Sequence, residues 1–406
     1  MATEVVELDG HLIDSLVLAR VLDAIVEAGA DYRMLEVDVG RTRQDPSHVV
    51  LEVRAASQSE LDLLLEQLQV HGVNRTARVA ATVVAAPADG VLPTGFYSTT
   101  NLPTRVLTAG GWLEVENPEM DCGLVVSGGS ARTVPMHRVR LGDPVVVGID
   151  GVEVAAPAPP RGPTPFAFMS SEVSSEKPKA LLLAEVARRL RRAREGGGRI
   201  LYVCGPAVVH TGAGPDLARL VREGWVDVLF AGNGFATHDL ESSVLGTSLG
   251  VSLEEGRPAE HGHANHLRVI NEVRRLGSIA AAVDGGYVRA GVMAECVRRD
   301  VPFLLAGSLR DDGPLPDVVT DVVAAADRMR ELLDGVRVAV MLATTLHAIA
   351  TGNLLPAWVE TYCVDINQAV VTKLADRGSH QALGIVTDVG LFVRSLASEL
   401  LADAPR

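Results

Sequence analysis

The stretch VRVAVMLATTLH, residues 336–347, decides the fold that we predict for this chain of 406 residues. Its first seven residues are almost all apolar and have the length of a strand. The small and polar residues Ala343, Thr344 and Thr345 follow in a loop, and a helical pattern comes after the loop. An apolar run without polar alternation is typical of a parallel strand that is buried on both faces.

The same pattern, an apolar run of strand length followed by a loop and then by helical periodicity, recurs along about the last 240 residues of the chain. The other apolar runs of strand length, each followed by a loop and a helical pattern, are residues 200–204, 226–231, 302–306, 357–364 and 382–387. Strands that alternate with helices predict a doubly wound, mostly parallel α/β sheet. We therefore expect one α/β domain over residues 166–406, with its active site at the carboxyl ends of the strands.

The residues before this domain divide into two further modules. Residues 1–86 follow the order β-α-β-β-α-β of a ferredoxin-like α+β domain, with its last strand at residues 77–85. Residues 87–165 contain short β-runs separated by Gly and Pro, which predict a small β-rich module that ends in a proline-rich linker. The β-runs of this module are residues 113–115, 123–126, 133–139 and 144–149.

Composition and charge exclude several classes of protein. The net charge of -14 leaves no basic surface for nucleic acid. The N-terminus is acidic and no apolar stretch reaches membrane-spanning length, so we expect neither a signal peptide nor a membrane anchor, and a cytoplasmic location. The four cysteines form no C-x-x-C motif, and the histidines of HGHANH, residues 261–266, do not have the spacing of a metal motif, so we predict no metal.

The predicted strand ends carry small and polar residues that suit a nucleotide. No G-x-G-x-x-G motif is present, and the turn Gly232-Asn233-Gly234 serves equally as a structural turn or a cofactor contact. Asp365 follows a strand, where a carboxylate accepts hydrogen bonds from ribose hydroxyls, and its alternative role is the N-cap of the next helix. The loop that contains Arg310, Asp311 and Asp312 has two possible roles. Its charged side chains could bind an amino-acid substrate, or its aspartates could cap a structural turn.

Longer strings carry a family resemblance. CGPAVVHTGAG (204–214), GNGFATHDLE (232–241), AGSLRDDGPLPDV (306–318), MLATTLHAIATGNLLP (341–356) and CVDINQAVVTKLADRGSHQALGIVTDVG (363–390) resemble the non-classical, NAD-dependent ornithine cyclodeaminases. This family was formerly named after lysine-oxoglutarate reductase and saccharopine dehydrogenase. It also supplies the C-terminal module of bifunctional enzymes that hydrolyse arginine. The resemblance covers nearly the whole chain and implies an NAD-binding sheet similar to that of deoxyhypusine synthase.

The resemblance also implies site residues. The NAD contacts that it implies are Asn233, Gly234, Asp311, Thr344, Thr345, Leu346, His347, Asp365, Ile366, Asp388 and Val389. The resemblance does not identify the groups that move protons. Our candidates for this task are Asp312, His210 and His266, and Lys177 is the candidate for positioning the substrate.

The implied reaction converts L-ornithine to L-proline and ammonia, with a hydride that is transferred to NAD and then returned. Arginine hydrolysis is not expected, because the hydrolase domain of the bifunctional enzymes has no counterpart in this sequence. We further expect a homo-oligomer, either a dimer or a tetramer. Two alternatives stay open: an opine- or saccharopine-type amino-acid dehydrogenase, and a non-catalytic NAD-binding regulatory protein.

Overall fold

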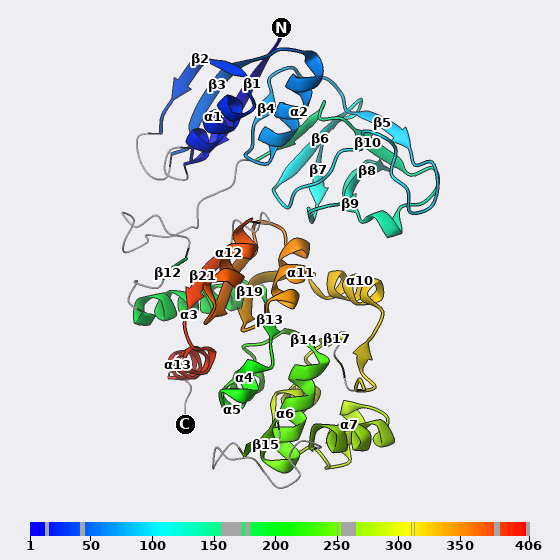
Figure 1. Cartoon of the computed structure of the whole chain (residues 1–406), viewed down its shortest axis with the longest axis vertical. Helices are drawn as coiled ribbons and strands as arrows, with labels where there is room; N and C mark the ends of the chain where they lie inside the picture. The colour runs from blue at the N-terminus through cyan, green and yellow to red at the C-terminus, as the bar shows by residue number, and fades with distance from the viewer. Residues whose placement is uncertain are drawn as a thin grey trace. The chain divides into compact units, whose positions relative to one another are not determined.

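The computed structural model describes residues 1–12, 16–40, 45–155, 173–174, 179–249, 251–252, 265–309, 311, 313–376 and 382–402 (Figure 1). The chain divides into two compact units. The first unit holds the described residues up to 155 together with Asn353–Trp358, and the second holds the other described residues from 173 onward.

The N-terminal part of the first unit is a four-stranded antiparallel sheet with the order β2-β3-β1-β4 and two helices. Its elements are β1 (Ala2–Gly10), α1 (Val17–Glu27), β2 (Asp31–Asp38), β3 (Ser47–Ala55), α2 (Gln58–Gln69) and β4 (Asn74–Arg75). Alternate residues of β3 are buried, and they join apolar residues of both helices in one core. This order and this connectivity confirm the ferredoxin-like domain.

The last predicted strand of this domain is wrong. The fourth strand is Asn74–Arg75, whereas β5 (Thr82–Ala85) pairs antiparallel with β10 (Pro144–Val147) in the following sheet. Residues 77–85 have the apolar character of a strand, and Val83 and Val84 are nevertheless exposed. The pattern therefore indicates an extended segment without indicating its partner.

The β-rich module is a seven-stranded mixed sheet with the order β11-β6-β7-β9-β8-β10-β5. Its remaining strands are β6 (Thr104–Thr108), β7 (Gly111–Glu116), β8 (Gly123–Ser127), β9 (Ser130–Val134) and β11 (Val152–Val154). The run predicted at 133–139 is wrong beyond Val134. Pro135 has no N–H to donate to a ladder, and the 3-10 turn Met136–Arg138 follows it.

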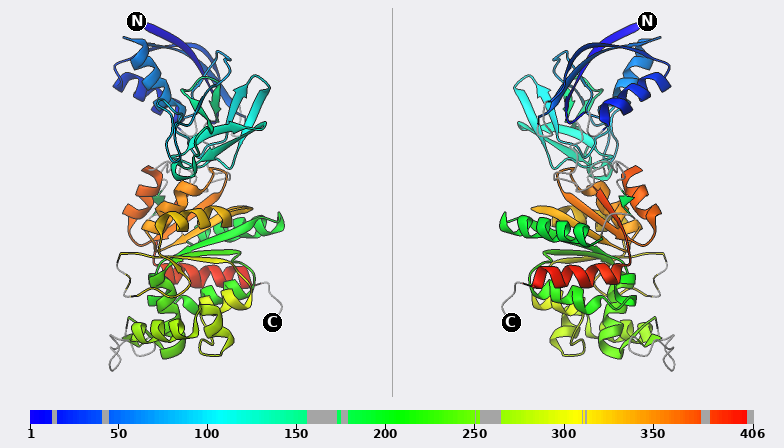
Figure 2. Two further views of the ribbon diagram at one scale, coloured as in Figure 1. Left: turned by 90° about the vertical axis from the view of Figure 1, so that its right-hand side faces the viewer. Right: turned by 90° about the vertical axis from the view of Figure 1, so that its left-hand side faces the viewer.

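The second unit is built on an eight-stranded sheet with the order β12-β21-β20-β19-β13-β14-β17-β18, and every ladder that joins neighbouring strands is parallel. The strands are β12 (Val173–Ser174), β13 (Arg199–Cys204), β14 (Val228–Gly232), β17 (Phe303–Ala306), β18 (Val318–Val319), β19 (Val336–Leu342), β20 (Glu360–Asp365) and β21 (Ala382–Val386). Helices lie on both faces of the sheet, with α13 (Val389–Leu401) on one side and α10 (Val322–Leu332) and α12 (Gln368–Asp376) on the other (Figure 2). The doubly wound parallel fold is confirmed.

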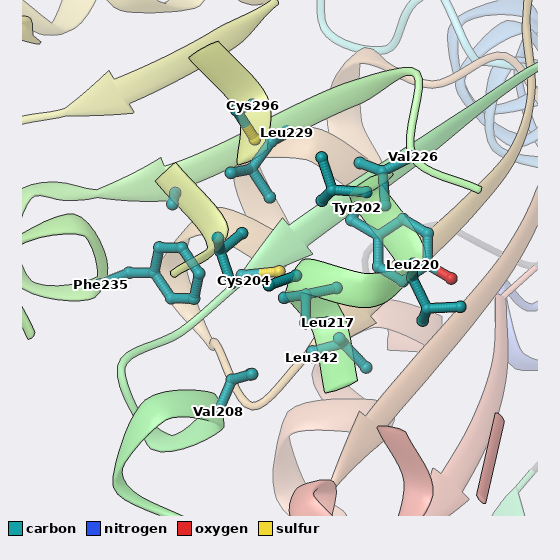
Figure 3. Close-up of a cluster of buried hydrophobic side chains, with 14 of the residues drawn as sticks. Tyr202, Cys204, Val208, Leu217, Leu220, Val226, Leu229, Phe235, Cys296 and Leu342 are labelled. Carbon is teal, nitrogen blue, oxygen red and sulfur yellow. The ribbon is translucent and has the colours of Figure 1, made fainter. Parts of the chain in front are cut away.

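The core of this unit is closely packed around β13. Tyr202, Cys204, Phe235 and Cys296 are among the side chains that fill it (Figure 3). All four cysteines of the chain are buried and unbridged. Burial raises the pKa of the Cys204, Cys296 and Cys363 thiols, because the interior disfavours the thiolate.

The arginine-rich helix α3 (Lys179–Glu195) exposes Arg188, Arg192 and Arg194 and buries Arg189. Arg189 is buried and its guanidinium donates to Glu185 and to Glu360 of β20. Arg194 stacks on the Trp225 ring. These arginines therefore bind groups of the protein itself. No helix in the described part of the chain has both the length and the apolar character needed to cross a membrane.

Candidate active site at the carboxyl ends of the parallel strands

The strand order of the large sheet reverses between β13 and β19. The chain proceeds from β13 to β14 and β17 in one direction, and it then returns to β19 and continues to β20 and β21 in the other. Ligands of open α/β sheets bind outside the carboxyl ends of the strands at such a reversal, because the connections diverge there and leave a crevice. The loops that follow β13 and β19 are therefore the centre of the candidate site.

These two loops approach each other through a glycine. The Gly205 N–H donates to the Leu342 carbonyl over 2.8 Å, and a Cβ atom on Gly205 would overlap the carbonyl oxygen of Ala343. Ala343 has a φ of 48°, which is a strained conformation for a residue with a side chain. A glycine is therefore required where the two loops meet.

The loop after β14 joins this contact. A Cβ on Gly232 would lie 2.7 Å from Cε1 of His347, so the imidazole sits directly over this glycine. The helix α6 (Asn233–Leu245) starts at the next residue, and the buried Asn233 side chain accepts the Leu315 N–H over 3.0 Å. Gly234 packs against Pro206 of the β13 loop. The predicted contacts Asn233 and Gly234 thus begin a helix beside the switch point, and the first N–H groups of a helix have no partner within the helix.

The loop after β19 leads into α11 (Leu346–Leu354). The side chain of Leu346 is 79% exposed, whereas His347 is half-buried and its pKa is lowered by burial. Asp311 opposes this shift, and its carboxylate also accepts the Ser308 N–H over 2.8 Å. The predicted residues Thr344 and Thr345 lie between β19 and this helix and are partly buried.

Asp365 ends β20 and is 8% exposed. One of its carboxylate oxygens accepts the Asn367 N–H over 2.8 Å. The alternative role of Asp365 as the helix cap is wrong, because Asn367 caps α12 by accepting the Ala369 N–H over 3.0 Å. Ile366 between them is 75% exposed. The Asp365 carboxylate at the end of β20 therefore does not cap the helix.

The last strand end combines a cap with a core residue. Asp388 is exposed and caps α13 by accepting the Leu391 N–H over 2.8 Å. The Val389 side chain is buried in the core. Gly390 lies against Thr211, which brings this loop to the end of the short helix α4 (Ala207–His210).

Two of the predicted catalytic residues meet at a third histidine. The rings of His210 and His238 are 4.7 Å apart between centroids, and those of His238 and His266 are 6.4 Å apart. Burial and the nearby His238 lower the pKa of His210. Asp312 and Lys177 lie outside the described residues, as do Arg310, His261 and His263.

Sequence reasoning missed His238 and Glu241. His238 Nδ1 lies 3.0 Å from Glu241 Oε2, and the Glu241 side chain is completely buried. The buried residues of α6 include the polar Asn233, Thr237 and Glu241 at intervals of four residues, which is unusual for a buried helix. This spacing is the sequence signal that could have identified Glu241.

The exposed side chains at this edge suit a dinucleotide. Leu309, Leu346 and Ile366 follow three different strands and each is at least 75% exposed, which offers apolar contacts to planar rings. Asp365 offers a carboxylate for ribose hydroxyls, and the start of α6 offers backbone N–H groups for phosphates. Among the described residues, no group of three or more His, Cys, Asp or Glu side chains could hold a metal ion.

Comparison with family models matches the chain almost from end to end. Residues 184–396 match the C-terminal Rossmann fold of ArgZ-like arginine dihydrolases, and residues 103–183 match the first region of the same C-terminal part. Residues 3–102 match the conserved region of the LOR/SDH bifunctional enzyme.

Curated proteins of similar sequence include the ornithine cyclodeaminase of Methanopyrus kandleri, which is 53% identical over 98% of this chain and 97% of that protein. The ornithine cyclodeaminase of Methanothermobacter thermautotrophicus is 50% identical over 98% of both chains.

Among solved structures, apo ArgZ, an arginine dihydrolase from cyanobacteria, matches with a TM-score of 0.85 and 37% identity over 99% of this chain and 58% of that chain. The ternary complex of AgrE with ornithine and NAD+ matches with a TM-score of 0.55 and 39% identity over 99% and 58%.

Proposed function

Since the chain belongs to the ornithine cyclodeaminase family that also forms the C-terminal part of ArgZ-like enzymes, we propose that it converts L-ornithine to L-proline and ammonia with bound NAD. The observation that carries the proposal is the 53% identity to an ornithine cyclodeaminase along practically the full length of both chains. The exposed apolar residues and the carboxylate at the strand ends support the cofactor.

NAD would lie along the carboxyl edge of the sheet. The start of α6 at Asn233 and Gly234 would receive the pyrophosphate, and Asp365 would accept hydrogen bonds from a ribose. When bound, NAD supplies a reversible acceptor for the hydride of the substrate Cα. The other residues that we assign to the cofactor site are Asp311, Thr344, Thr345, Leu346, His347, Ile366, Asp388 and Val389.

The protein must remove protons from the amines of ornithine and exclude water from the reacting carbon. His210 suits the first task, because the lowered pKa of its imidazole keeps it neutral near pH 7. His266 is a second candidate on the same cluster. Asp312 as a proton acceptor and Lys177 as a substrate-positioning cation stay predictions from the sequence.

Incubation of the purified protein with L-ornithine and substoichiometric NAD tests this function. We expect many equivalents of proline and ammonia per NAD and little accumulated NADH. Product that stops at one equivalent of NADH would identify a conventional dehydrogenase. Tight NAD binding without turnover of ornithine, lysine or diaminobutyrate would identify a regulatory protein.

We also propose that the protein is a cytoplasmic homo-oligomer. The edge strand β2 supports the assembly, because no strand among the described residues pairs with its outer side and Met34, Leu35 and Val37 are each more than two-fifths exposed. The four unbridged cysteines support a reducing compartment. Light scattering of the protein and of a Leu35→Lys, Val37→Lys double variant tests the assembly, with a smaller particle expected for the variant.

A further inference from the structure

Helix α6 carries a line of buried polar side chains. Asn233, Thr237 and Glu241 follow one another at intervals of four residues, so they share one face of the helix, and each is at most 5% exposed. The Thr237 hydroxyl lies 3.5 Å from Asn233 Oδ1. Burial of polar groups costs free energy unless they are fully hydrogen-bonded. Three buried polar side chains on one face of a helix therefore need a structural or catalytic reason.

Glu241 is held at both carboxylate oxygens. Its Oε1 accepts the Thr247 hydroxyl over 2.7 Å, and its Oε2 faces His238 Nδ1 over 3.0 Å. The Asn265 amide donates in turn to Thr247 Oγ1 over 3.0 Å. When Glu241 is ionised its carboxylate only accepts hydrogen bonds, so it selects the His238 tautomer with the proton on Nδ1 and fixes the orientation of the ring.

His238 in turn contacts His210. The two rings meet edge to face, with an interplanar angle of 64°. His210 Nδ1 lies 2.7 Å from the hydroxyl of Ser248, which is the neighbour of Thr247 in the two-residue strand β15 (Thr247–Ser248). Adjacent hydroxyls of one short strand thus hold the carboxylate at one end of the cluster and the imidazole at the other.

We propose that Glu241 and His238 are positioning residues that hold His210 as the general base of the reaction. This inference rests on the proposed function. His210 ends α4, which follows β13 immediately and lies between the loops of β14 and β21, as the contacts of Pro206 with Gly234 and of Thr211 with Gly390 show. The base therefore belongs to the same loop as Gly205 at the switch point.

The proton step assigned to His210 is simple. With Nδ1–H donating to Ser248, Nε2 of His210 carries the lone pair. One N–H bond of the substrate α-ammonium breaks, the proton forms a bond with Nε2, and the electron pair stays on the amine nitrogen, where it assists the departure of the hydride from Cα. The titratable groups that act on His210 within the described part of the chain are His238 and Glu241.

Steady-state kinetics of the full-length, NAD-loaded protein test the proposal. We expect Glu241→Gln to lower kcat about tenfold or more, since its amide can donate to Nδ1 of His238 and impose the wrong tautomer. NAD affinity should stay unchanged. Glu272→Gln, the same substitution on the surface of α7 (Asn265–Leu276), is the matched control and should keep the wild-type kcat. Wild-type kcat and pH profile in Glu241→Gln would overturn the proposal.

The pH profile separates positioning from a purely structural role. His210→Ala should lower kcat about a hundredfold or more and regain activity with added imidazole. His238→Gln should move the acid limb of kcat/KM to higher pH, because His238 lowers the pKa of His210. An unmoved limb, or no recovery with imidazole, would contradict the proposal.

Two further measurements cover the cases in which Glu241→Gln does not fold or the wild-type protein is inactive. If Glu241→Gln does not fold, Thr247→Val removes the hydroxyl from the other carboxylate oxygen and should give a smaller loss of kcat. If the wild-type protein forms no proline, the proposed function fails. The cluster is then judged by an NMR titration of His210, whose pKa should rise in His238→Gln.

Discussion

Gly205 lies against the carbonyl oxygen of Ala343, so that no side chain fits between the loops that follow the two central strands. We expect Gly205→Ala to destabilise the protein by about 1–3 kcal/mol, because the added Cβ forces these loops apart. NAD affinity should fall with it. Thermal unfolding and calorimetric titration with NAD measure both effects. Gly196→Ala, at an exposed position where a Cβ meets only ordinary contacts, is the control and should change neither.

Asn233 offers a test that separates stability from cofactor binding. Asn233→Ala leaves the buried Leu315 N–H without its acceptor and should cost about 1–3 kcal/mol. Asn233→Asp keeps an acceptor but places a negative charge where we propose the pyrophosphate binds. This variant should therefore unfold at a higher temperature than Asn233→Ala and lose NAD affinity. Equal NAD affinity in Asn233→Asp and the wild type would place the pyrophosphate elsewhere.

Asp365 is expected to bind a ribose of NAD through its charge. Asp365→Asn retains an oxygen for the Asn367 N–H, so the turn should persist. The loss of a charged acceptor should weaken NAD binding about tenfold or more. Calorimetric titration measures the affinity, and Asp321→Asn, at the exposed cap of α10, serves as the control. An unchanged dissociation constant would remove Asp365 from the cofactor site.

Asp239 should make stability depend on pH. Burial raises its pKa to about 6, although the Val292 and Met293 N–H groups donate to it. A carboxyl group with a raised pKa in the folded state favours folding below its unfolded value and loses that contribution as the pH rises through the folded value. Relative to Asp239→Asn, the wild type should lose up to about 3 kcal/mol between pH 4 and pH 6, and no more above that range.

Thermal unfolding of both proteins across this range measures the effect. A constant difference between them from pH 4 to pH 6 would mean that the pKa of Asp239 is unshifted. The shift is independent of activity, so this prediction stands apart from the proposed function.

The sequence predicts the central strands of the large sheet well for a physical reason. Strands such as β13 and β19 are buried on both faces, and continuous apolar runs appear only where no face meets water. The two-residue strands β12 and β18 are too short to produce any period, and they were missed. The exposed β5 was found as a strand but assigned to the wrong sheet, since pairing depends on distant residues.

In the candidate site, too, some features follow from the local sequence and others depend on tertiary packing. Asp365 and Asn233 follow apolar runs directly, so their positions at strand ends follow from the local sequence. The cluster of His210, His238 and Glu241 depends on how α4 packs against α6, which no local pattern specifies. The substrate itself follows from the family resemblance, because strand ends of this kind accept many nucleotides. The domain limits at residues 86 and 165 stay predictions.

The burial of all four thiols has a practical consequence for experiments on this protein. Cys122, Cys204, Cys296 and Cys363 are each at most 1% exposed, so alkylating reagents do not reach them in the folded protein. The raised pKa values of the Cys204, Cys296 and Cys363 thiols slow the reaction further. A single cysteine introduced on the surface, for example at Ser398 on α13, would therefore react selectively with a maleimide dye. Fluorescent labelling would need no prior removal of native cysteines.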